Sequence, residues 1–167
     1  MKKIFMVLTA VVAVFALAAC NGGGKGAEDI EALKGNVIEC DKFSMNVPKS
    51  MKETYKSDIA FNVSNEDEET KMDATFSDYP CKPEDFEKYA QGLTGMELFS
   101  LYKFDKPVID GNIMTIKGVN GDRVMNQFVV YLGEKAGVAG KVEYPVAKAA
   151  EMEELLVPML KSIKQKQ

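Results

Sequence analysis

The sequence predicts an α+β fold, in which an antiparallel β-sheet of about six to seven strands is flanked by two main helices in an α/β/α sandwich. Two observations carry this prediction. Apolar and polar residues alternate along several short segments, which is typical of strands with one buried face. Two other stretches, one in mid-chain and one near the C-terminal end, have apolar residues at helical spacing.

The first strands are expected over residues 43–47, 59–63 and 72–76, where every second residue is apolar. The polar run 65–69 joins the last two as a hairpin turn, and residues 52–57 are expected to form a further, polar strand. The alternating apolar residues are Phe43, Met45, Val47, Ile59, Phe61, Val63, Met72, Ala74 and Phe76.

The first helix is predicted over residues 83–94. Pro83 suits a first helical position, and Glu84 and Asp85 are favourable in the first turn. Gly95 can cap the C-terminal end of this helix. The residues that recur at helical spacing are Phe86, Tyr89, Ala90 and Leu93.

Further strands follow, and two hairpin turns separate some of them. Asp110-Gly111-Asn112 and Asn120-Gly121-Asp122 are typical turn sequences, because Gly readily adopts the positive φ that such turns need. Residues 103–109 are expected either to continue a strand or to cross over between strands. The predicted strands cover 99–104, 113–119, 123–132 and 138–144.

Pro145 opens the second helix, whose apolar residues form one broad stripe that is typical of packing against a sheet. Pro158 lies within the stripe and removes the backbone hydrogen bond to Glu154, so we expect a kink or a break there. The stripe consists of Ala149, Met152, Leu155, Leu156, Met159, Leu160 and Ile163.

The N-terminal segment is typical of a secretory signal peptide. It begins Met1-Lys2-Lys3, and its apolar run 4–19 is shorter than the roughly 20 residues that a spanning helix needs. The run ends in Leu17-Ala18-Ala19-Cys20, which resembles the lipobox of bacterial lipoproteins. This resemblance implies that residues 1–19 are removed and that Cys20 is lipidated, which makes the lipid bilayer a partner. It also implies a place in the bacterial cell envelope, and Asn21 after the Cys favours the outer membrane over the inner membrane.

Residues 20–36 are predicted to be a tether, since 22–26 is rich in Gly and has nothing to pack. Residues 28–34 could form two helical turns or simply extend this tether. Residues 37–167 are long enough for one domain with one core, and we predict a single α+β domain there.

The composition excludes several classes of function. The chain has no His, which rules out Ser-His-Asp and Cys-His nucleophile systems and most zinc sites. Arg123 is the only Arg, too few for an Arg cluster that captures phosphate. The formal net charge of -4 gives no electrostatic reason to bind nucleic acid. No catalytic residue, cofactor or metal site is predicted.

Cys40 and Cys81 are the two cysteines beyond Cys20, and an oxidising compartment makes them a disulfide candidate. Such a bridge would stabilise the domain by about 4 kcal/mol in the chain-entropy model. Two buried free thiols remain the other interpretation. The spacing is not Cys-x-x-Cys, so a redox motif is not indicated.

The order of elements, the opening Phe43-Ser44-Met45-Asn46-Val47-Pro48 and the closing Lys161-Ser162-Ile163 resemble the PsbP-like superfamily over roughly residues 37–163. That group includes a photosystem II subunit, a Ran-binding import factor and many bacterial lipoproteins. The resemblance implies an α/β/α sandwich and a binding or accessory role. No residue that carries metal or Ran contacts in that group has a match here.

The function expected from these observations is that of a membrane-anchored, non-enzymatic binding or accessory protein of the periplasm or cell surface. Its partner is a protein or a small molecule. One alternative is a hydrolase of envelope or surface glycans that works through two carboxylates. Another is a purely structural envelope protein, which the absence of both a cleft and an apolar patch would favour.

Overall fold

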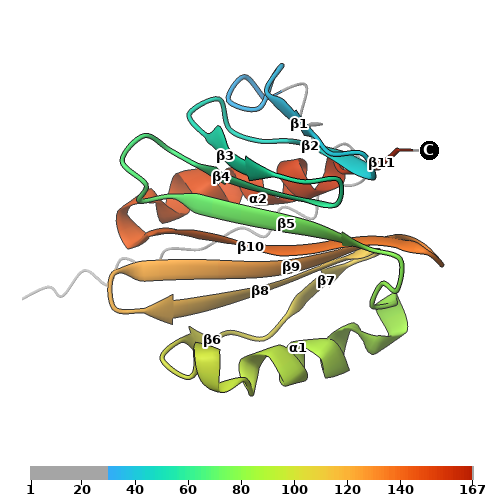
Figure 1. Cartoon of the computed structure of the whole chain (residues 1–167). Helices are drawn as coiled ribbons and strands as arrows, with labels where there is room; N and C mark the ends of the chain where they lie inside the picture. Colours follow the sequence, from blue (N-terminus) through green and yellow to red (C-terminus); the bar gives the residue numbers. More distant parts are fainter. Residues whose placement is uncertain (1–29, 167) are drawn as a thin grey trace, which may run out of the picture.

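The computed structural model describes residues 30–166, and the domain is built from two sheets and two helices. Helix α1 (Phe86–Thr94) covers one face of a large sheet, and helix α2 (Ala149–Lys161) lies on the other side with a small sheet (Figure 1). This arrangement confirms the α+β sandwich predicted from the sequence. None of the helices in the described range is long and apolar enough to cross a membrane.

The large sheet has eight strands, more than the six to seven expected, and every pair in it is antiparallel. The hairpins fall where the turn sequences predict them, with Gly111 at φ 61° and Gly121 at φ 58°. Its strands are, in spatial order, β3 (Lys52–Lys56), β4 (Ala60–Ser64), β5 (Lys71–Ser77), β10 (Ala136–Pro145), β9 (Arg123–Gly133), β8 (Ile113–Asn120) and β6 (Lys103–Phe104), with β7 (Val108–Asp110) also paired to β8.

The small sheet corrects the expectation of a single sheet. Strand β2 (Phe43–Asn46) was predicted, but it pairs with β1 (Val37–Glu39) and β11 (Lys164–Gln165) and not with the large sheet. Neither β1 nor β11 was predicted. Both are short, and the two residues of β11 are exposed and polar, so they carry no alternating apolar pattern.

The strand predicted over 99–104 is mostly wrong. Residues Glu97–Phe99 form a 3₁₀ turn, and only Lys103–Phe104 is a strand. The turn closes because the backbone N–H groups of Ser100 and Tyr102 donate to the carbonyls of Glu97 and Phe99. The edge next to β8 therefore consists of β6 and β7 with a break between them.

The two predicted helices are present, but their α-helical parts begin a few residues later than predicted, at Phe86 and at Ala149. The chain makes a 3₁₀ turn at Pro83–Asp85 before α1 and another at Val146–Lys148 before α2. A kink or a break was expected at Pro158, and of these the break is absent: α2 continues to Lys161. Pro158 stands so near the C-terminal end that only three further residues follow it in the helix.

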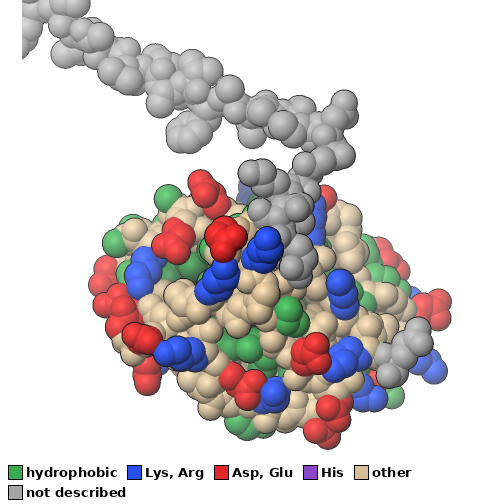
Figure 2. Space-filling model, turned by 90° about the horizontal axis from the view of Figure 1, so that it is seen from above, with side chains coloured by type: hydrophobic (Ala, Val, Ile, Leu, Met, Phe, Trp, Pro, Cys, Tyr) green, Lys and Arg blue, Asp and Glu red, His purple; other side chains and the backbone are tan. Residues whose placement is uncertain are grey.

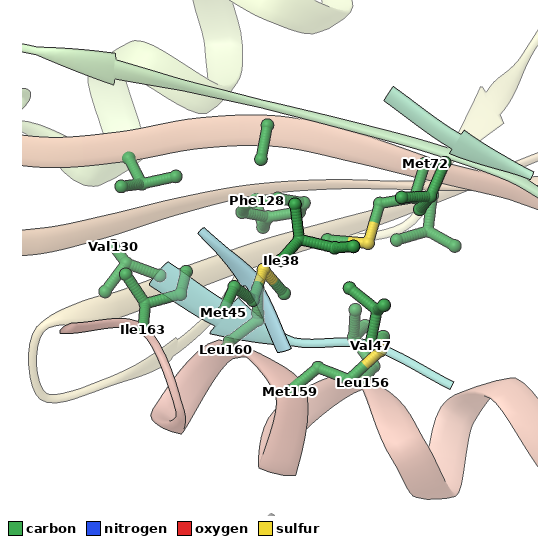
Figure 3. Packing of buried hydrophobic residues seen from close by; sticks show 14 of the residues in the cluster. Ile38, Met45, Val47, Met72, Phe128, Val130, Leu156, Met159, Leu160 and Ile163 are labelled. Atoms are coloured by element: carbon green, nitrogen blue, oxygen red, sulfur yellow. The ribbon is translucent and has the colours of Figure 1, made fainter. Parts of the chain in front are cut away.

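The main core lies between the large sheet and the layer formed by α2 and the small sheet (Figure 3). Side chains from β1, β2, β5, β9 and α2 meet there, as Ile38, Met45, Met72, Phe128 and Met159 illustrate in Figure 3. A second, smaller cluster lies under α1 and consists of Phe86, Ala90, Met114, Ile116 and Val129.

The predicted tether 20–36 overlaps the described chain at residues 30–36. There the backbone N–H groups of Leu33 and Lys34 both donate to the Ile30 carbonyl, so residues 30–34 form one turn. Leu33 is fully buried in the main core, and Ile30 packs against it. This part of the segment thus contributes to the packed domain.

Candidate functional site

Helix α1 covers only half of its face of the large sheet. Its cluster contacts β8 and β9, through Met114, Ile116 and Val129. On β4 and β5, beyond the reach of the helix, Asn62 and Thr75 of the same face are exposed. The open half of this face is the candidate site.

The pairing register brings a row of polar side chains together on this open half. Asn62 on β4 lies opposite Asp73 on β5, and Asp73 lies opposite Lys141 on β10. Lys141 in turn lies opposite Gln127 on β9. Because directly opposed residues share one face of a sheet, these four side chains form a continuous row that leads towards α1.

Two adjoining hollows follow this row, of about 410 Å³ and about 320 Å³, and both are lined by Asp73 and Lys141. The outer hollow extends to Glu143 and to strand β4, and the inner hollow extends under α1 to Tyr89 and Phe99. Together they are named the open groove, defined by Asn62, Lys71, Asp73, Thr75, Gln127, Lys141 and Glu143.

The charges in the open groove are close to one another. The Lys141 ammonium donates to Glu143 Oε1 at 2.5 Å. Burial raises the pKa of the Asp73 carboxyl; the charge of Lys141 and a hydrogen bond from the Lys141 backbone act in the opposite direction without cancelling it. Burial lowers the pKa of Lys141, but the bond to Glu143 and the charges of Glu143 and Asp73 outweigh it, so that this pKa is raised.

Aromatic rings from β6 and from the loop that precedes it cluster at the α1 side of the groove. Phe104 makes an edge contact with Phe99 at 6.3 Å and a tilted contact with Tyr102 at 6.1 Å between ring centroids. Burial raises the pKa of Tyr102, with a smaller contribution from Glu143. The Phe104 ring lies directly on Gly118, where a Cβ atom would stand 2.7 Å from it, so the site needs glycine there.

Apolar side chains project from the same loop into solvent. Leu98 is 77% exposed and Leu101 is 74% exposed, and Met96 is also exposed. A further cavity of about 610 Å³ lies between α1 and the break that separates β6 from β7, with Gln91, Pro107 and Ile116 in its lining. Met96, Leu98 and Leu101 are named the apolar rim; they belong to the same loop as Phe99, which lines the inner hollow.

The opposite layer has a different character. Figure 2 shows acidic and basic side chains interspersed on the face that carries the small sheet. Ion pairs in this layer include Lys49 with Glu31 at 2.6 Å and Lys166 with Glu39 at 3.2 Å, all with substantially exposed side chains. Such exposed pairs contribute little to stability and define no site.

The site residues predicted from the sequence are Cys20 for lipidation and Cys40 and Cys81 for a possible disulfide. Cys20 and the rest of the lipobox lie outside the described residues. The possible Cys40–Cys81 disulfide is corrected: both cysteines are free in the structure. Cys40 belongs to the main core on the α2 side, whereas Cys81 packs against the cluster under α1, so the sheet separates the two thiols.

The acidic and basic residues of the open groove were not singled out from the sequence. Asp73, Lys141 and Glu143 each occupy the polar positions of an alternating strand, which are ordinarily solvent-facing. Only the pairing register places them together. Within residues 30–166, no cluster of three or more Cys, Asp and Glu side chains could hold a metal ion.

No protein-family model and no curated protein sequence matches the chain. Solved structures do resemble it. The cyanobacterial PsbP (CyanoP) of Synechocystis sp. PCC 6803 is 8% identical, with a TM-score of 0.54 over 90% of this chain and 99% of that one. The Ran-binding protein Mog1p of Saccharomyces cerevisiae is 15% identical, with a TM-score of 0.51 over 74% of this chain and 89% of that one.

These similarities concern the fold. The domain is an α+β sandwich with a PsbP-like fold, as the sequence resemblance implied. At identities of 8% and 15%, the similarity does not carry over the residues with which either protein works.

Proposed function

We propose that the protein is a lipid-anchored, non-enzymatic binding or accessory protein of the bacterial cell envelope, and that it binds its partner through the open groove. One observation carries the second part of this proposal. The open groove holds charged and amide side chains that are partly removed from water on a sheet face that α1 covers only in part. Partly buried polar groups without a full set of partners are costly to stability, and they are commonly kept where a ligand completes them.

The place where the chain enters the domain supports this interpretation. Ile30 and Leu33 pack into the main core with α2 and the small sheet, whereas the open groove lies on the α1 side. A lipid-anchored tether that enters on the α2 side leaves the open groove and its apolar rim accessible to a partner. A groove and an apolar rim also weigh against a purely structural role.

The lipid anchor is proposed from the lipobox-like sequence Leu17-Ala18-Ala19-Cys20. To test it, cells that express the protein are grown with a labelled fatty acid. The wild-type protein should take up label and fractionate with membranes, and Cys20→Ala should lose both properties. Label or membrane association that survives in Cys20→Ala contradicts the anchor. Placement in the outer membrane predicts that Asn21→Asp moves the protein towards the inner-membrane fraction.

Binding through the open groove is tested with a photo-crosslinking amino acid introduced singly at Asn62 and at Thr75, which are exposed in the groove. The matched control carries it at Glu151, exposed on α2 at the opposite layer. In intact cells we expect the same adduct from both groove positions and none from position 151. Equal adducts from both faces, or none from the groove, would overturn the proposal.

A specific observation also favours the glycan hydrolase as a second candidate. Asp73 and Glu143 lie on neighbouring strands of one face, as diagonal neighbours in the register. Such neighbours are separated by about 7–8 Å, which is within the range for two glycosidase carboxylates. The raised pKa of Asp73 suits a general acid. Release of soluble sugars from cell-wall glycan, abolished by both Asp73→Asn and Glu143→Gln, would establish this activity in place of simple binding.

A further inference from the structure

The inner hollow of the open groove contains a buried amide that lacks a proper partner. Gln127 is 4% exposed and lines this hollow together with Asp73 and Lys141. Its amide nitrogen donates only to the Met125 thioether, at 3.5 Å, which is a weak acceptor. No protein donor reaches its amide oxygen among the described residues. This amide oxygen is not a fully buried atom, so within the hollow it stays accessible to a ligand that donates a hydrogen bond.

The charges of the groove favour a cationic donor. Lys141 is already bound to Glu143 at 2.5 Å, so these two charges largely cancel. The Asp73 carboxylate then remains as the excess charge, partly buried between Asn62 and Lys141 in the register. A cation placed beside Asp73 would compensate the cost of holding this carboxylate in a poorly hydrated site.

Apolar walls in the same hollow suit a stem that carries the cation. Tyr89, Leu93 and Phe99 line it on the side of α1 and the following loop, opposite the polar row. Aromatic rings attract a nearby ammonium or guanidinium group in addition to packing against its methylenes. The volume of about 320 Å³ accommodates a single elongated group of this type.

From this arrangement we propose that the inner hollow binds an organic cation, namely a primary ammonium or guanidinium group on a slender apolar stem. The cation lies against Asp73, one of its N–H groups donates to the amide oxygen of Gln127, and the stem lies along Tyr89 and Phe99. Two sources offer this chemistry: a Lys or Arg side chain of a protein partner, and a free diamine. The inference rests on the proposed function, since it names the chemistry that the open groove recognises.

The test is a titration of the full-length protein, purified in detergent and followed by calorimetry and by NMR of the groove residues. The probes are 1,5-diaminopentane and the peptides Gly-Arg-Gly and Gly-Lys-Gly, with glutarate as the anionic control and N-acetylglucosamine as the neutral polyol. We expect at least one cationic probe to bind and both controls to leave the groove unchanged. Binding of the peptides alone identifies a protein side chain as the natural ligand, and binding of the diamine alone identifies a free amine.

Substitutions of residues that line the inner hollow test whether the cationic probe binds there. Asp73→Asn and Gln127→Leu should each weaken the binding cationic probe at least tenfold, and Asp58→Asn, in the exposed turn between β3 and β4, should not change it. Lys141→Met, which keeps the stem and removes the competing positive charge, should strengthen it severalfold. This last variant keeps the test decisive if a groove variant folds poorly, because a poorly folded protein does not gain affinity.

Several results would overturn the inference. These are the absence of binding by all cationic probes, binding that Asp73→Asn leaves intact, or preferential binding of glutarate or of N-acetylglucosamine. Failure of the inference is separable from failure of the proposed function. If photo-crosslinks from Asn62 and Thr75 persist while no cation binds, the groove still receives a partner and only the named ligand chemistry is wrong.

Discussion

The two faces of the large sheet differ in how completely they are covered. On the α2 side, nearly all the alternating residues of β4, β5 and β9 are apolar and buried, as Phe61, Met72 and Phe128 show. On the α1 side, the same strands carry Asn62, Asp73 and Gln127, and only the half near β8 is apolar and covered.

The closed face on the α2 side mainly stabilises the fold, whereas the open face on the α1 side has the features of a binding site. On the closed face the buried Asn126 amide has a strong partner, since its Nδ2 donates to the Tyr144 hydroxyl at 2.5 Å, although the buried Thr70 hydroxyl has none among the described residues. The open face leaves the Gln127 amide with a weak acceptor and the Asp73 carboxylate partly desolvated. One face thus holds the fold together, while the other is locally less stable than it could be, which is common at binding sites.

The sharpest test of this contrast uses two adjacent residues of β4 that point to opposite faces. Phe61→Ala should lower the free energy of unfolding by about 3–5 kcal/mol, because its fully buried ring stacks on Phe43. Asn62→Ala should change it by no more than about 0.5 kcal/mol. Urea denaturation measures both values, and similar values for the two variants would contradict the contrast.

The buried pair on the closed face gives the next largest effect. Tyr144→Phe leaves the amide of Asn126 without its acceptor and should cost about 1–3 kcal/mol. The double variant Tyr144→Phe/Asn126→Leu should recover much of this loss, because neither polar partner remains. Tyr131→Phe, on the other face of β9 and half-buried, is the control and should have little effect. A Tyr144→Phe protein as stable as the wild type would show that the pair is not important.

The same pair should be visible in an alkaline titration. Burial raises the pKa of Tyr144 to about 12, with Glu153 adding to the rise and the bond from Asn126 opposing it. The unfolded chain ionises this group at about pH 10, so stability falls as the pH rises above that value.

Asp73 on the open face should give a smaller pH effect of the same direction, and there a substitution should stabilise the protein instead of destabilising it. Because burial raises the pKa of Asp73, the folded state binds its proton more tightly than the unfolded state does. The resulting destabilisation is present at pH 7 and is lost as the pH falls through the folded pKa. Asp73→Asn should therefore raise the melting temperature at pH 7 and have no effect at pH 3, where the carboxyl is protonated in both states. A variant less stable than the wild type at pH 7 would contradict this.

The smallest expected effect concerns the cysteines on the two faces. A Cys20→Ala protein, denatured without reductant, should show two free thiols, from Cys40 and Cys81. Reductant should leave its melting temperature unchanged, whereas breaking a disulfide would lower it. A thiol count of zero would show that Cys40 and Cys81 form a disulfide after all. The two cysteines would then have to meet around an edge of the sheet.

Much of the closed face could be predicted from the sequence, because its signal is local. Alternation at Met72, Ala74 and Phe76 indicates a buried strand face without knowledge of its neighbours, and the structure confirms it. The small sheet could not be predicted in the same way. Strand β11 has only Lys164 and Gln165, and it forms because Ile163 before it is drawn into the core and brings it beside β2.

The open groove depends on register, which a single sequence does not specify. Asp73 and Lys141 are far apart in the chain, and each alone occupies an ordinary solvent-facing position of a strand. What unites them is the pairing of β5 with β10, together with the position of α1 over β8 and β9, which leaves β4 and β5 open. The lipobox prediction is different in kind: it is entirely local, and it stays a prediction because its residues lie outside the described chain.

The small sheet has a mechanical consequence. A pull on the chain at Ile30, opposed by a partner held at the open groove, would first load the turn that ends at Lys34 and then the pairing of β1 with β2. That pairing is only three residues long, whereas β9 and β10 are paired along ten positions. Under tension, the short sheet would separate first and lengthen the chain that precedes β2, whereas the longer pairings beside the open groove would separate only at a larger force.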